Sequence, residues 1–253
     1  MFDNLKILVT SDTHGNLPKI TTPFDLLLIC GDISPTHDHY YAYQINWFQH
    51  QFAEWINILP FKDEWSKVVI IGGNHDFMME RISNEELKCF YITTNNRVVV
   101  LKNEEYDYEY LSDEGIKTLK IFGTPYCKIF GSWAFMVSNE KLATKYSFIP
   151  ENCDILMSHD APDINNLGLI SSGTYSGENA GNIVLAEAIK EKKPKFAFCG
   201  HIHSGNHMFT KENDTWLANV SYVNERYSPY YPEEQGIFVL DLDRNTKEPV
   251  FDK

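Results

Sequence analysis

Side chains that can bind metal ions recur in five short segments of the chain, each directly after an apolar run. The segments are SDTHG at residues 11 to 15, GD at 31 to 32, GNHD at 73 to 76, SHD at 158 to 160 and GHIH at 200 to 203. Residues two apart in an extended segment point the same way, so the Asp-x-His and His-x-His spacings let both side chains reach one site. The pattern predicts a metal site assembled from several segments.

The candidate ligands supply carboxylates, imidazoles and one amide oxygen. They are Asp12, His14, Asp32, Asn74, His159, His201 and His203. Nitrogen and oxygen donors without a thiolate favour first-row divalent ions over calcium. Seven ligands are too many for one tetrahedral ion, so we expect two divalent metal ions, manganese first, with iron, nickel or zinc also suited. Such a pair can hold a bridging hydroxide and clamp the oxygens of a phosphoryl displacement, with Asp32 as the natural shared ligand.

Each segment also has an ordinary structural interpretation. A lone histidine after an apolar run is often a core or surface residue, and Asp12 or Asp32 could cap a helix. Four further histidines have no motif partner: His37, His39, His50 and His207. We expect these four at the surface, although the first two follow GDISP closely enough to line a pocket. All five segments in sequence, each after a strand-like run, favour a shared site.

The apolar runs predict the strands that must position these residues. LKILVTS, FDLLLICG, KVVIIGG, CDILMSH and KFAFCGH are continuous rather than alternating, as expected of strands buried on both faces of a sheet. Residues 41–58 and 179–191 carry apolar residues at helical spacing, so strands alternate with helices in an α/β fold. From about residue 97, and again near the end, strand-like segments joined by turns predict antiparallel edges and two sheets. In open α/β sheets, ligands bind at the carboxyl ends of the strands.

Composition narrows the class of protein. The 253 residues are 43% hydrophobic and 23% charged, as in ordinary globular proteins, and the net charge of −13 disfavours long nucleic acid as a partner. We expect one domain over residues 1–253, with no signal peptide, no membrane segment and a cytoplasmic location. The five cysteines form no C-x-x-C pair, which favours reduced, buried thiols over a disulfide framework.

The five segments resemble, in order, the motifs of the calcineurin-like metallophosphoesterase superfamily, over residues 12 to 203. GDISP lacks the Val-Asp-Arg-Gly continuation of the serine/threonine phosphatases, and the chain looks more similar to the small phosphodiesterase branch that includes MPPED-type and class III cyclic-nucleotide enzymes. The resemblance implies a four-layer α/β/β/α sandwich of two mixed β-sheets flanked by helices, with the metal site at the strand carboxyl ends.

The resemblance also implies roles for individual residues. One ion would be held by Asp12, His14, Asp32 and His203, and the other by Asp32, Asn74, His159 and His201. His75 is similar to the catalytic histidine of the family, with Asp76 orienting its ring, and the neighbouring glycines would let the backbone approach the metals. Asp160 departs from relatives that carry glycine there; it either bonds locally or adds negative charge near the metals.

The expected function is therefore a dinuclear metal-dependent hydrolysis of a small phosphodiester, with a cyclic or small nucleotide as the candidate substrate. Tyr126, Phe130 and Trp133 are either packing residues or a wall that stacks a nucleobase. The alternatives are a phosphomonoesterase of the same fold, a nuclease with a local basic groove, and a non-catalytic metal-binding interaction scaffold. The sequence gives no indication of oligomeric state.

Overall fold

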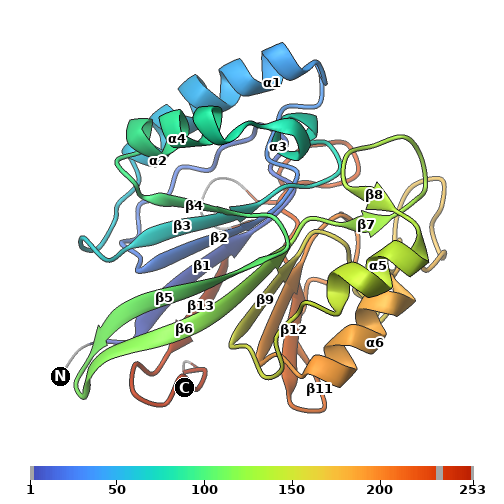
Figure 1. Cartoon of the computed structure of the whole chain (residues 1–253). Coiled ribbons are helices and arrows are strands. Elements are labelled where there is room, and N and C mark those ends of the chain that lie inside the picture. Colours follow the sequence, from blue (N-terminus) through green and yellow to red (C-terminus); the bar gives the residue numbers. More distant parts are fainter. Residues whose placement is uncertain (1–2, 232–235, 252–253) are drawn as a thin grey trace.

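Two large β-sheets lie face to face at the centre of the molecule (Figure 1). The computed structural model describes residues 3–231 and 236–251. The first sheet has the order β13-β1-β2-β3-β4, in which β1 to β4 are parallel and β13 is antiparallel to β1. Its strands are β1 (Leu5–Thr10), β2 (Leu26–Cys30), β3 (Lys67–Ile71), β4 (Val98–Leu101) and β13 (Phe238–Leu242).

The second sheet has the order β11-β12-β10-β9-β6-β5. Its four central strands, β12, β10, β9 and β6, are parallel to one another, and the edge strands β11 and β5 are antiparallel to their neighbours. Its strands are β5 (Glu104–Ser112), β6 (Gly115–Thr124), β9 (Ile155–Ser158), β10 (Phe196–Cys199), β11 (Thr210–Glu212) and β12 (Thr215–Asn219). A small parallel pair joins β7 (Cys127–Lys128) to β8 (Met136–Val137). The predicted antiparallel edges are therefore confirmed.

Helices cover the outer face of each sheet (Figure 1). Those over the first sheet are α1 (Tyr41–Trp47), a π-helical segment (Phe48–Phe52), α2 (Ala53–Asn57), α3 (Phe77–Arg81) and α4 (Asn84–Thr93). Those over the second sheet are α5 (Asn139–Tyr146) and α6 (Ile183–Lys192). The predicted four-layer α/β/β/α arrangement is confirmed.

Successive side chains of a buried strand point alternately to the two faces of its sheet and fill the cores on both sides. In β1, Leu8 packs toward the helices, while Ile7 and Val9 pack between the two sheets. Because both faces are buried, the strand is apolar throughout, which explains the continuous runs seen in the sequence. Four of the five cysteines are buried and all five are free thiols, but Cys89 on α4 is exposed, contrary to the prediction for that residue.

The predicted helix over 41–58 is confirmed, although its middle turn widens to π-helical geometry at Phe48–Phe52. The helix predicted from residue 179 begins later, at Ile183. The side chain of Asn182 accepts a hydrogen bond from the backbone nitrogen of Leu185 at 3.1 Å and caps the first turn. None of the helices in the described part of the chain has the length and apolar character needed to span a membrane.

Candidate metal centre

All seven predicted ligands come together beyond the carboxyl ends of parallel strands from both sheets. The loops after β1, β2 and β3 supply Asp12, His14, Asp32 and Asn74, and the loops after β9 and β10 supply His159, His201 and His203. Every one of them is buried except His201, which is partly exposed. The site therefore lies at the seam between the two sheets.

The backbone turns abruptly where it presents these side chains. Four of the seven residues have positive φ angles: 52° at Asp12, 46° at His14, 52° at Asp32 and 68° at His201. A non-glycine residue rarely adopts this left-handed conformation, and such strain concentrates at functional sites. The conformation is what turns each side chain back toward the common centre after its strand has ended.

Two groups of side chains can each hold one metal ion. In each group, one donor atom per residue lies within 4.8 Å of the others; the groups are Asp12, His14 and His203, and Asp32, His159 and His201. The carboxylate of Asp32 lies between them, since its Oδ2 is 3.6 Å from His14 Nε2 and 3.5 Å from His159 Nε2. A carboxylate in this position can contribute to both groups.

The hydrogen bonds of the imidazoles fit bound cations. His159 Nδ1 lies 3.0 Å from the carbonyl of Cys30, which can only accept, so Nδ1 carries the hydrogen. In the neutral ring, the electron pair of Nε2 then faces the amide oxygen of Asn74 at 2.9 Å. Two electron-pair donors at that separation need a proton or a cation between them, and metal binding replaces the proton.

In the other group, a backbone carbonyl again fixes the hydrogen of one imidazole. His203 Nδ1 lies 3.1 Å from the carbonyl of Asn224, which fixes its hydrogen there, and Nε2 faces His14 Nε2 at 3.2 Å and Asp12 Oδ1 at 3.5 Å. Carbonyl partners of this kind orient the ring of a metal ligand and select its tautomer. The donor set therefore fits divalent metal ions in both groups.

Burial and mutual charge shift the pKa values of the site residues. Burial raises the pKa of Asp32 to about 6, and the nearby charge of Asp12 acts in the same direction. Burial alone would lower the pKa of His203, but its interaction with Asp12 raises that pKa to about 9. Correspondingly, His203 holds the pKa of Asp12 below its usual range despite burial. The site is thus built around carboxylates that attract positive charge.

Asp76 occupies a different environment from the one expected. The carboxylate of Asp76 is fully buried and accepts hydrogen bonds from the backbone nitrogens of Ile33, Ser34 and Gly73, at 2.8 to 3.1 Å. Asp76 therefore joins two turns and makes no hydrogen bond to the His75 ring, so the prediction that it orients that ring directly is wrong.

The ring partner of His75 is instead His39, whose Nε2 lies 3.0 Å from His75 Nδ1. Gln44 on α1 holds the backbone beside it: its amide nitrogen donates to the carbonyl of His75 at 2.7 Å, and its amide oxygen accepts from the nitrogen of Met78 at 2.9 Å. Burial lowers the pKa of His75 to about 4, so the ring is neutral near pH 7. His39 is one of two histidines, with His37, for which the sequence left a pocket position open.

Of the two alternatives for Asp160, local hydrogen bonding is the one that the structure shows. Its Oδ2 accepts hydrogen bonds from the backbone nitrogen of Lys128 at 2.9 Å and from the amide nitrogen of Asn182 at 2.7 Å. Burial raises the pKa of this carboxyl group. Asp160 thereby links β7 to the cap of α6, directly after the candidate ligand His159 in the sequence.

The metal site opens into a pocket of 240 Å³. Ligands and His75 line it together with Phe130, Trp133, Glu225 and Tyr227. Of the three aromatic residues that the sequence left as either packing residues or a wall, Phe130 and Trp133 thus line the pocket, whereas Tyr126 packs against the hydrophobic cores. Tyr227 and Glu225 come from the segment after Asn224 and were not among the predicted site residues. No lysine or arginine is among the described residues that line this pocket.

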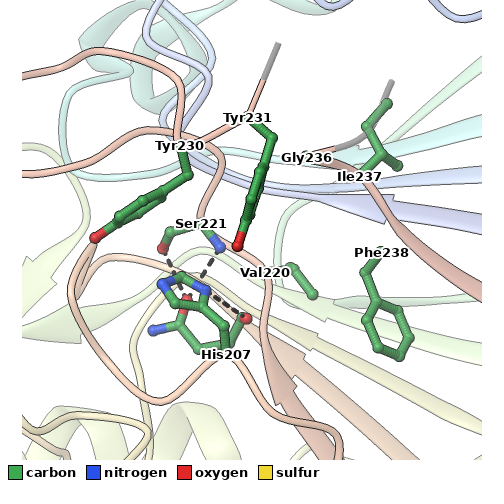
Figure 2. Close-up of a pocket in the computed structure, with 9 residues that line it drawn as sticks. His207, Val220, Ser221, Tyr230, Tyr231, Gly236, Ile237 and Phe238 are labelled. Carbon is green, nitrogen blue, oxygen red and sulfur yellow. Dashed lines mark hydrogen bonds between the residues drawn. The ribbon is translucent and has the colours of Figure 1, made fainter. Parts of the chain in front are cut away.

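A second cavity has a volume of 320 Å³ (Figure 2). His207, Ser221, Tyr230 and Tyr231 are among its lining residues. The hydroxyl of Ser221 donates to Asp12 Oδ2 at 2.8 Å, and His207 Nε2 lies 2.7 Å from the carbonyl of His203. This cavity therefore borders the residues that hold two of the ligands in place.

Comparisons with known proteins agree with this geometry. The chain is 25% identical to human metallophosphoesterase domain-containing protein 1 over 256 residues, covering 94% of this chain and 71% of that protein. It is 27% identical over 241 residues to UPF0046 protein C25E10.12 of Caenorhabditis elegans, covering 91% and 80% of the two chains. The phosphopantetheinyl hydrolase of Mycobacterium tuberculosis shares the fold, with a TM-score of 0.54 at 14% identity over 95% of this chain and 97% of that one.

The match to a family covers most of the sequence. Residues 5–205, which include every predicted ligand, match the calcineurin-like phosphoesterase family. The chain therefore belongs to the calcineurin-like phosphoesterase family.

Proposed function

We propose that the protein hydrolyses a phosphodiester with the help of two divalent metal ions, and that a small or cyclic nucleotide is its substrate. The observation that supports this most directly is the pair of buried ligand groups on either side of Asp32, at the floor of an open pocket. Asp12, His14 and His203 would hold one ion with Asp32, and His159, His201 and Asn74 would hold the other with Asp32. When bound, the ions would supply a hydroxide nucleophile near neutral pH and offset charge on the phosphate oxygens.

The remaining pocket residues have roles that do not depend on holding an ion. His75 lines the pocket, and a ring N–H there would donate a hydrogen bond to a phosphate or leaving oxygen. Trp133 and Phe130 offer aromatic faces on which a planar group of the substrate can stack. Their positions favour an ester whose organic part is flat, as a nucleobase is.

The charge of the pocket favours a diester over a monoester. A phosphodiester carries one negative charge, whereas a monoester carries close to two at neutral pH. Glu225 lines the pocket, and no lysine or arginine is among its described lining residues. Apart from the metals, therefore, nothing in this lining would offset the second negative charge of a monoester.

The test is hydrolysis of bis(p-nitrophenyl) phosphate beside p-nitrophenyl phosphate by metal-stripped protein, with manganese, nickel, zinc or magnesium added back. We expect metal-dependent turnover of the diester that disappears in Asp32→Ala. His75→Ala should keep its metal content and lose turnover by roughly 10²-fold or more. Turnover of the monoester alone would identify a phosphatase, and no turnover despite two bound ions would favour the scaffold alternative.

A further inference from the structure

The His75 ring is held by a second imidazole. His39 lies in the loop between β2 and α1, and its ring centroid is 5.1 Å from that of His75. Trp133 packs against both rings, with centroid distances of 5.3 Å to His39 and 4.5 Å to His75. Phe77 adds an edge contact to His39 at 5.6 Å. The pair is therefore fixed by packing as well as by its hydrogen bond.

A single hydrogen lies between the two facing nitrogens. His39 Nε2 and His75 Nδ1 are 3.0 Å apart, so one donates and the other accepts. If His75 Nδ1 donated, the neutral ring would present a bare electron pair at Nε2. If His39 donates, His75 carries its hydrogen at Nε2, which makes no hydrogen bond to any described residue. A pocket that takes an anionic phosphoester needs a donor there, because like electron pairs repel.

We propose that His39 is a positioning residue: it donates its Nε2 hydrogen to His75 Nδ1 and thereby fixes the His75 tautomer whose Nε2–H faces the substrate pocket. This inference rests on the proposed function, because it assigns His75 a role toward a phosphoester. A carboxylate in the place of His39 would have the opposite effect, since it can only accept and would select hydrogen at Nδ1. An imidazole that donates to Nδ1 leaves the Nε2 hydrogen of His75 available to the pocket.

A hydrogen at Nε2 of His75 would stabilise the leaving group. The attacking water gives up one proton to solvent as its oxygen forms the new bond to phosphorus, and the ester oxygen leaves with the electron pair of the old bond. The Nε2–H of His75 stabilises the leaving oxygen by a hydrogen bond and stays on the ring. The leaving oxygen takes its proton from solvent.

Two substitutions of equal length separate donor from acceptor. His39→Gln places an amide N–H near the position of the imidazole Nε2, so it can still donate to His75. His39→Glu places a carboxylate there, which can only accept. Thermal unfolding and metal content of both variants verify that the fold and the metal site are retained.

The decisive measurement is the tautomer of His75 in the zinc-loaded protein, read from long-range ¹H–¹⁵N correlations and assigned with His75→Ala. We expect hydrogen at Nε2 in the wild type and in His39→Gln, and hydrogen at Nδ1 in His39→Glu. Hydrogen at Nδ1 of His75 in the wild type would overturn the proposal, as would one tautomer shared by both variants. Because the wild-type spectrum decides by itself, a variant that fails to fold does not remove the test.

Kinetics with bis(p-nitrophenyl) phosphate supply the second readout. We expect His39→Gln to stay within about threefold of wild-type kcat, and His39→Glu to lose about tenfold or more at nearly unchanged KM, as befits a transition-state donor. Equal losses in both variants would reduce His39 to a packing residue. Absence of wild-type turnover would contradict the proposed function, whereas the spectra would still decide the arrangement of the histidine pair.

Discussion

Among individual residues, Gly73 shows most clearly why the site tolerates little change. A methyl group on Gly73 would collide with the carboxylate and backbone nitrogen of Asp32 and would lie 2.7 Å from Cε1 of His159. Both contacts are with proposed ligands, and the first is partly backbone, which cannot move aside cheaply. Glycine is required here because the loop after β3 closely approaches both the loop after β2 in the same sheet and His159 from the other sheet.

We therefore expect Gly73→Ala to displace Asp32, lower the number of bound metal ions per chain and reduce turnover by roughly 10²-fold, since small displacements of reacting groups have effects of that size. Metal content by mass spectrometry and kcat measure the two effects. Gly173→Asn is the control, because a side chain there meets no atom within 4 Å and asparagine tolerates its φ of +82°. Full metal content and turnover in Gly73→Ala would refute this account.

Among the elements, the turns after β2 and β3 depend on one another through Asp76. The two strands are parallel neighbours, and the carboxylate of Asp76, after β3, accepts from Ile33 and Ser34, after β2. The bond from Gly73 closes its own turn in the same way. One buried side chain therefore fixes the separation of the loops that present Asp32 and Asn74.

Asp76→Asn should destabilise the fold, because an amide NH₂ replaces an oxygen that accepts backbone hydrogen bonds. The expected loss in the free energy of unfolding is about 1–3 kcal/mol, as for a buried group that loses its partner. Urea unfolding measures it, with the exposed Asp214→Asn as control. A loss no larger than that of the control would mean that Asp76 does not hold the turns together.

The sequence predicted the elements better than it predicted the partners of single residues. Continuous apolar runs revealed the buried strands, and the polar residues at their ends revealed the seven candidate ligands, because both signals are local. The His39–His75 pair, the bonds of Asp76 and the position of Tyr227 depend on the paths of loops in space. Residue type and spacing do not determine those paths, so the sequence assigned Asp76 to the His75 ring instead of to the backbone nitrogens that it binds.

At the scale of the whole molecule, the site joins the two sheets. Asp12, Asp32 and Asn74 follow strands of the first sheet, whereas His159 and His203 follow strands of the second. An ion held by ligands from both would bind the folded chain and not the unfolded one. On this ground we also propose that residues 1–253 form one domain.

Removal of the metals should therefore lower the stability of the entire chain. Binding to the folded state alone stabilises by about 2.7 kcal/mol when free metal is 100 times its Kd. We expect the thermal midpoint to rise with manganese concentration in the wild type and to depend on it far less in Asp32→Ala. A wild-type midpoint that ignores metal concentration would show that the ligands do not tie the sheets together.

The lining of the 240 Å³ pocket has a consequence for the order of events. In a chain of net charge −13, a mouth that holds a glutamate and, among its described residues, no lysine or arginine draws cations inward and slows the approach of anions. The proposed metals would then arrive quickly and reverse the local field. An anionic substrate would diffuse in efficiently only afterwards, so metal binding would have to precede substrate binding.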